Sequence, residues 1–177
     1  MTGSSAPMIV WFRDDLRLSD HPALHAAAET GAPLVCLYVL DEESSHQRPP
    51  RGRPIGSASR WWLAQSLRSL QGSLAAHGQS LILRRGPAAK VIADLAQEAR
   101  ASAVHWTESD VPGQAAAERE VAAALYHIGV AARSFPSDLL VRPASLRNKE
   151  GRGLRVFTPF WKRVLSLGDP PQPLTAP

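Results

Sequence analysis

Five short apolar runs alternate with longer segments whose apolar residues recur every three or four positions, and this alternation constrains the fold of the 177-residue chain. The run Leu34–Leu40 contains no charged residue, as is typical of a strand covered on both faces. Strands that alternate with helices form a parallel sheet, and right-handed crossovers then place helices on both of its faces. The sequence therefore predicts an α/β fold, a doubly wound five-stranded parallel sheet. Its strands are Met8–Phe12, Leu34–Leu40, Leu81–Leu83, Ala103–Trp106 and Val130–Phe135.

Four helices are predicted between these strands. They cover Pro22–Glu29, Ser57–His77, a segment with Pro87 in its first turn, and Pro112–Ile128. The buried stripe of the second helix is predicted to comprise Trp61, Leu63, Leu67, Leu70 and Leu74. Trp62 is turned about 100° from Trp61 around the helix axis, so we expect it to lie against a neighbouring loop.

Composition places the chain among ordinary globular proteins, because 44% of its residues are hydrophobic and 20% are charged. Its apolar runs are much shorter than the ~20 residues that cross a bilayer, and its first residues resemble no secretory signal. The single cysteine, Cys36, lies inside an apolar run and is expected to be a core residue rather than a nucleophile. These features predict a cytoplasmic protein that has no membrane partner.

The basic residues are unevenly distributed in a chain of net charge +4. They can be solvated loop charges, or they can contact DNA phosphates or an acidic partner domain. The two groups are Arg48, Arg51 and Arg53 in the predicted loop 41–54, and Arg142, Arg147, Lys149, Arg152 and Arg155 near the end of the chain.

The alternating pattern stops after Phe135, which divides the chain into two parts. Residues 1–136 form the predicted α/β domain. Residues 137–177 contain short apolar pieces and end in the proline-rich stretch 168–173, which is typical of an extended linker. We expect this second part to lead to a further domain that is absent from these residues.

Several common site motifs are absent. No G-x-G-x-x-G follows the first strand, and no Walker-type phosphate loop is present. His21 and His25 are four positions apart, but no neighbouring residue completes a metal site with them. His105 falls in the fourth strand and is expected to pack in the core. The sequence therefore predicts neither a metal site nor a catalytic residue on this chain.

A dense cluster of charges spans residues 13–20, directly after the first strand. In one interpretation it is a structural ion-pair knot, in which Arg13 and Arg17 pair with Asp14, Asp15 or Asp20 while Asp20 caps the first helix. In the other, Arg13 directs its planar guanidinium at a phosphate or carboxylate of a ligand. Both interpretations can hold together.

Ligands of doubly wound sheets bind beyond the carboxyl ends of the strands. Here those ends are Phe12–Arg13, Leu40–Asp41, Arg84–Arg85 and Trp106–Thr107. The segment Thr107–Asp110 can accept hydrogen bonds from a heterocycle or from ribityl hydroxyls. Equally, Ser109 or Asp110 can cap the helix that begins near Pro112.

Four motifs resemble the amino-terminal domain of the DNA photolyase and cryptochrome family. They are WFRDDLR at 11–17 with Asp20 and Pro22–Leu24, GSASR at 56–60, LILRR at 81–85 followed by Gly86-Pro87, and FTPFWK at 157–162. The chain departs from the family in three places. It has His21 where Asn is frequent, Pro87 where an Asp is usual, and Thr107–Pro112 in place of an Asn followed by an Asp-Tyr-Glu-Pro-like run.

The resemblance implies a flavodoxin-like antenna domain of a photolyase, the enzyme class that uses light to repair pyrimidine dimers in DNA. FAD, and the contacts to damaged DNA, would belong to a carboxy-terminal helical domain of the same protein. This domain would hold an antenna chromophore, a reduced folate or a deazaflavin. The residues implied for that site are Phe12, Arg13, Leu40, Asp41, Gly56, Arg60, Thr107, Glu108 and Asp110. A cryptochrome-like photoreceptor and a stand-alone nucleotide-binding module are the alternatives.

Overall fold

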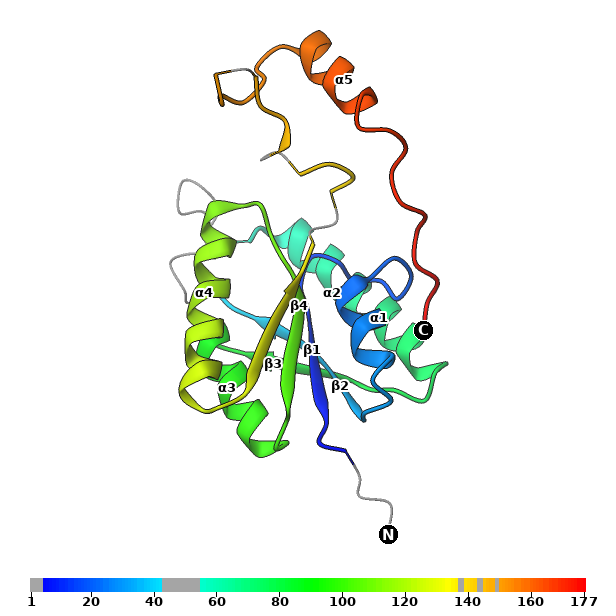
Figure 1. The fold of residues 1–177 in the computed structure, drawn as a ribbon. Helices are drawn as coiled ribbons and strands as arrows, with labels where there is room; N and C mark the ends of the chain where they lie inside the picture. Colours follow the sequence, from blue (N-terminus) through cyan, green and yellow to red (C-terminus); the bar gives the residue numbers. More distant parts are fainter. Residues whose placement is uncertain (1–4, 43–54, 137–138, 143–144, 149) are drawn as a thin grey trace.

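The computed structural model describes residues 5–42, 55–136, 139–142, 145–148 and 150–177. Arg48, Arg51, Arg53 and Lys149, for which two interpretations were open, lie outside the described residues. Five parallel strands form one sheet in the order β3-β2-β1-β4-β5, with helices on both faces (Figure 1). The strands are β1 (Met8–Phe12), β2 (Leu34–Leu40), β3 (Leu81–Arg85), β4 (Ala103–Thr107) and β5 (Ala131–Phe135). The predicted doubly wound fold is confirmed.

Side chains of β1 alternate between two cores because β1 lies at the centre of the sheet. On one face, Ile9 and Trp11 pack with α3 (Ala88–Glu98) and α4 (Pro112–His127). On the other face, Met8, Val10 and Phe12 pack with α1 (Pro22–Ala28) and α2 (Ser57–Ala75). Cys36 is buried in this second core, as predicted. His105 is also buried, as predicted.

Strand order reverses at β1, because the chain winds from β1 through β2 to β3 and then crosses to β4 on the other side. The carboxyl ends of β1 and β4 therefore stand side by side, with Trp11 opposite Trp106 in the register. The connections diverge from this point to opposite faces of the sheet. This is the place where a doubly wound sheet leaves a crevice for a ligand.

The helix starts differ from the sequence predictions. His21, not Asp20, caps α1, because its Nδ1 accepts the backbone N–H of Leu24 at 3.1 Å. Pro87 is the N-cap of α3 rather than part of its first turn. The N-cap of α4 is Val111, so neither Ser109 nor Asp110 caps it. Ser109 instead accepts the backbone N–H of Val111 through its hydroxyl.

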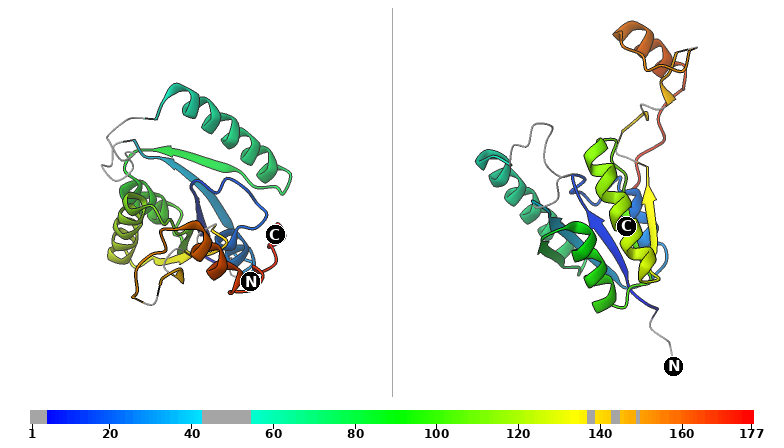
Figure 2. Two further views of the ribbon diagram at one scale, coloured as in Figure 1. Left: turned by 90° about the horizontal axis from the view of Figure 1, so that it is seen from above. Right: turned by 90° about the vertical axis from the view of Figure 1, so that its left-hand side faces the viewer.

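The prediction that Trp61 is buried was wrong. Only Leu70 and Leu74 of α2 are buried, both in the second half of the helix. The first half extends along the outer side of the sheet, beside β3, where no other described helix or strand covers it (Figure 2). Helical periodicity gave the correct face of the helix but not the length over which that face meets the sheet.

The segment that follows β5 leaves the sheet and carries α5 (Phe157–Leu165) above the carboxyl ends of the strands (Figure 1). The chain then returns along α1, where Leu174 pairs with Asp20. Between β5 and α5, an isolated antiparallel bridge joins Arg147 to Gly153. Within the described residues, no helix has both the length and the apolar character needed to cross a membrane.

Candidate functional site

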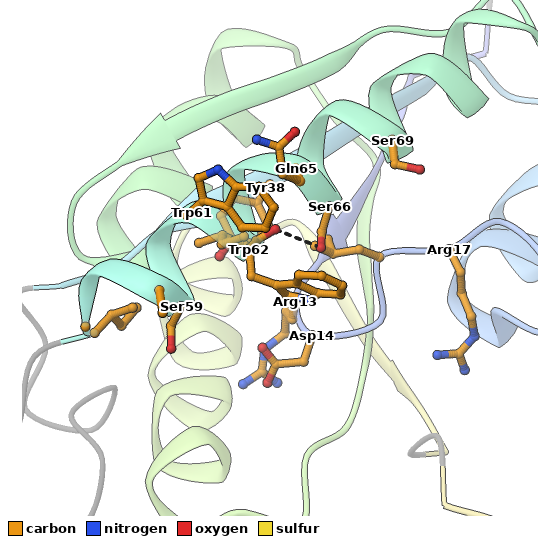
Figure 3. A pocket seen from close by; sticks show the side chains of 15 residues that line it. Arg13, Asp14, Arg17, Tyr38, Ser59, Trp61, Trp62, Gln65, Ser66 and Ser69 are labelled. Carbon is orange, nitrogen blue, oxygen red and sulfur yellow. Dashed lines mark hydrogen bonds between the residues drawn. The ribbon is translucent and has the colours of Figure 1, made fainter.

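A hollow with a volume of about 1350 Å³ lies between α2 and the carboxyl end of β1 (Figure 3). Its α2 wall begins at Gly56 and extends to Ser69. Arg13, Asp14 and Tyr38 form part of the opposite wall. We call this space the tryptophan hollow, because Trp61 and Trp62 both line it.

Trp61 and Trp62 are unusually open to solvent for residues of their type, with 62% and 68% of their surface exposed. Their ring centroids are 6.3 Å apart and the rings are tilted by 43°. Tyr38 lines the same hollow, and burial, together with the charge of Asp14, raises its pKa to about 12. Two indole faces and a neutral phenol therefore offer a planar ring both stacking surfaces and a hydrogen-bond donor.

Arg13 is fixed by α4. Its Nη1 pairs with Oε1 of Glu118, and its side chain is only 9% exposed. The guanidinium carbon lies 4.8 Å from the centroid of the Trp11 ring, in a cation–π contact. Glu118 accepts a second hydrogen bond from the backbone N–H of Ser109 at 2.8 Å. The expected partners Asp14, Asp15 and Asp20 were therefore wrong for the side chain of Arg13, which reaches across the crevice instead.

A second, smaller hollow of about 250 Å³ lies at the crevice between β1 and β4. Gln114 of α4 spans its mouth, because its Nε2 donates to Oδ2 of Asp14 at 2.9 Å and its Oε1 accepts the hydroxyl of Ser109. Arg13 and Asp14 line both hollows and thus separate them. We call this second space the crevice hollow.

Asp15 organises the loop that follows β1 and lines the crevice hollow. Its Oδ1 accepts the backbone N–H of Arg13 at 3.0 Å, and its Oδ2 lies 3.0 Å from Nε2 of His21. Burial alone would raise the pKa of Asp15. The close contact and charge of His21, together with Thr107 and the backbone N–H of Arg13, outweigh burial and hold that pKa well below its usual range. Arg17 does not join this group, because both its guanidinium contacts go to the carbonyl oxygen of Asp20.

The residues implied for the site fall into three sets. Arg13 and Gly56 line the tryptophan hollow, while Arg13, Thr107, Glu108 and Asp110 line the crevice hollow. Phe12, Leu40, Asp41 and Arg60 line neither hollow.

The residues outside both hollows have structural contacts. Phe12 is buried beneath the loop. Asp41 accepts the backbone N–H of Ala88 at the start of α3, at 2.9 Å. Arg60 pairs with Glu42. Within the crevice hollow, Glu108 pairs with Arg142 and accepts the hydroxyl of Ser134.

Sequence reasoning missed Tyr38, Gln114 and Glu118, and it assigned Trp61 to the core. A signal was present only for the tryptophans, since two adjacent indoles cannot both face the core of a helix that packs on one side. Among the residues that the structure describes, no group of three or more His, Cys, Asp or Glu side chains could hold a metal ion.

Comparison with known proteins relates this chain to one family. The family model for DNA photolyase matches residues 8–177. The deoxyribodipyrimidine photo-lyase of Agrobacterium fabrum is 38% identical over 183 residues, which cover 100% of this chain and 36% of that protein. Cryptochrome-1 of Arabidopsis thaliana is 37% identical over 178 residues, covering 99% of this chain and 25% of that protein.

The solved structures agree with the sequence comparison. The crystal structure of a bacterial class III photolyase from Agrobacterium tumefaciens superposes with a TM-score of 0.85 at 39% identity, covering 97% of this chain and 34% of that one. The chain thus spans about a third of the length of the photolyases it matches. It belongs to the DNA photolyase family and corresponds to the amino-terminal α/β domain of its members.

Proposed function

We propose that this chain is the light-harvesting domain of a deoxyribodipyrimidine photolyase and that its tryptophan hollow holds the antenna chromophore, a reduced folate or a deazaflavin. The observation that carries the proposal is the pair Trp61 and Trp62. Both are exposed, and both line a hollow of about 1350 Å³ in a member of the photolyase family. Exposed indoles beside a hollow of this size suit a planar heterocycle.

The ring system would lie against Trp61, Trp62 and Tyr38, with Arg13 and Gly56 at its edge. The crevice hollow, at about 250 Å³, is better suited to a small group than to a whole folate or flavin. Thr107, Glu108 and Asp110 would therefore stand beside the chromophore rather than around it. Phe12, Leu40, Asp41 and Arg60 would support the walls from outside.

The partner in this proposal is a carboxy-terminal helical domain of the same protein, which would hold FAD and contact damaged DNA. Support comes from α5, where Phe157, Trp161 and Leu165 recur every four residues and are 71%, 47% and 61% exposed. Such an apolar stripe is typical of a helix that packs against a further surface. In this proposal residues 1–136 form the antenna domain and 137–177 the connection, in a cytoplasmic protein.

The test is a titration of the purified chain with a reduced folate and with a deazaflavin, followed by chromophore absorbance and tryptophan fluorescence. We expect saturable binding that is lost in Trp61→Ala/Trp62→Ala. Tyr126→Ala removes an aromatic ring that is 80% exposed on α4, away from the hollow, and serves as the matched control. Equal binding by both variants would place the chromophore elsewhere, and no binding by the folded wild-type chain would contradict the proposal.

A cryptochrome-like photoreceptor is the second candidate, because a cryptochrome matches at 37% identity, nearly the same as the photolyase at 38%. The two functions differ in whether the full-length protein repairs pyrimidine dimers under blue light. Repair of a dimer-containing oligonucleotide by the full-length protein, measured against a dark control, decides between them.

A further inference from the structure

We infer that Glu118 determines which part of a ligand the tryptophan hollow accepts beside Arg13: an uncharged ring atom rather than a phosphate or a carboxylate. This inference rests on the proposed function for the ligand itself, although its main test does not use the chromophore. It replaces the expectation that the guanidinium of Arg13 receives an anion. Glu118 would thus act as a specificity-determining residue without contacting the ligand.

Glu118 and Trp11 already hold the guanidinium of Arg13 in place. Its Nη1 pairs with Glu118, its side chain is only 9% exposed, and its guanidinium plane lies over Trp11. Nη2 is buried and has no hydrogen-bond partner among the described residues. An anion that approached from the hollow would have to displace Glu118, whose own side chain is only 11% exposed, and leave that carboxylate buried without its partner.

The charges around Arg13 also disfavour an anion. Asp14 lines both hollows together with Arg13, and Asp15 accepts the backbone N–H of Arg13. Glu118 pairs with the guanidinium itself, whereas Asp15 contacts the backbone of Arg13. A phosphate at this position would place a second negative charge beside the carboxylate of Glu118. A ring carbonyl or ring nitrogen carries no net charge and meets no such repulsion.

The orientation of the ligand follows from the second cation of the hollow. Arg17 also lines it, and its guanidinium donates to the uncharged carbonyl oxygen of Asp20 at 3.2 and 3.0 Å. Figure 3 shows Arg17 apart from the group formed by Arg13, Asp14 and Trp62. The ring system therefore enters toward Arg13, and the anionic end of the ligand points toward Arg17.

The experiment follows the guanidinium Nε–H resonance of Arg13 by NMR, assigned by its loss in Arg13→Lys. Inorganic phosphate is added at constant ionic strength, with chloride as the reference. We expect no saturable shift in the wild-type chain. In Glu118→Gln, which removes the competing charge and retains the shape, the shift should saturate with an apparent Kd at least about tenfold lower than any wild-type response.

Glu118→Asp retains the charge and should behave like the wild type. A saturable shift in the wild-type chain would overturn the inference, and so would an unresponsive Arg13 in folded Glu118→Gln. The wild-type titration alone decides if Glu118→Gln fails to fold.

The orientation has its own test, in which riboflavin is compared with FMN by tryptophan fluorescence. The two compounds share a ring system and differ by one phosphate. We expect the wild-type chain to prefer FMN and Arg17→Gln to lose that preference, whereas retention of it would overturn the orientation. If neither compound binds, the orientation is overturned, while the phosphate titration still decides the role of Glu118 and the folate and deazaflavin titration decides the proposed function.

Discussion

The backbone N–H of Asp20 donates a hydrogen bond to the carbonyl oxygen of Leu174 at 2.8 Å, across more than 150 residues of chain. The carboxylate of Asp20 returns the contact by accepting the N–H of Leu174 at 3.3 Å. Asp20 has a φ of 51°, a value uncommon for residues other than glycine. The guanidinium of Arg17 also stabilises this loop, because it donates two hydrogen bonds to the carbonyl oxygen of Asp20.

Leu174→Pro should weaken the pairing of Asp20 with Leu174, because proline has no N–H to donate to the carboxylate of Asp20. A lost hydrogen bond is worth about 1 kcal/mol, so hydrogen exchange at the Asp20 amide should accelerate by roughly fivefold. Gln172→Pro is the matched control, since it stiffens the same segment and leaves the Leu174 N–H in place. Equal exchange rates in the two variants would mean that the Leu174 contact does not protect Asp20.

Arg13→Ala should destabilise the fold because it leaves the buried carboxylate of Glu118 without its partner. The expected decrease in the free energy of unfolding is about 3 kcal/mol, measured by urea denaturation. Lys90→Ala breaks an exposed pair with Asp94 and should change the same quantity by less than about 0.5 kcal/mol. An unchanged midpoint in Arg13→Ala would show that the ion pair with Glu118 adds nothing to stability.

The stability contributed by Asp15 should depend on pH. Its pKa is lowered in the folded protein, so the unfolded chain takes up a proton first as the pH falls. The contribution is therefore complete above the unfolded pKa of about 3.9 and is lost as the pH falls toward the lower folded value. At neutral pH, Asp15→Asn should lower the free energy of unfolding by about 2 kcal/mol.

The pH profile provides the check on that assignment. The difference between wild type and Asp15→Asn should shrink progressively in acid, as followed by urea denaturation at a series of pH values. Asp94→Asn, at an exposed position, should show a smaller difference throughout. A difference for Asp15→Asn that stays constant down to acid pH would mean that its charge is not the source of the stability.

Cys36 should be unreactive in the folded protein. It is buried beneath α1 and α2, and burial raises the pKa of its thiol to about 11. Because the thiolate is the reactive form, a disulfide reagent should modify the native chain very slowly and modify it stoichiometrically in guanidinium chloride. Rapid modification without denaturant would indicate that this core opens frequently.

Local sequence patterns predicted the strands and helices of the sheet region well because β1, β2 and β4 are rich in buried apolar residues and the predicted core residues of the helices repeat with the helical period. Cys36 and His105 were placed correctly on the same grounds. The helix caps were harder, because His21 and Asp20 are adjacent and only the three-dimensional path of the loop decides which side chain reaches Leu24. Strand β1 matched its predicted bounds, whereas β3 and β4 extend beyond theirs.

The candidate site was predictable only in outline. The carboxyl ends of β1 and β4 could be expected to meet, and Arg13 and Thr107 both lie there. The partner of Arg13 could not be predicted, because Glu118 lies 105 positions away in the sequence. Nothing in the sequence distinguishes Glu118 from the other acidic residues as a partner. Trp61 was misplaced because periodicity carries no information about where a helix passes beyond the sheet that it covers.

The partial packing of α2 has a mechanical consequence. Leu70 and Leu74 attach the second half of α2 to the core, whereas the half that carries Trp61 and Trp62 has no buried residue. A helix that is packed at one end only can be displaced at its other end at a smaller cost in free energy than a helix packed along its whole length. The spacing between the indoles and the strand ends can therefore adjust to rings of different thickness while the two cores keep their packing.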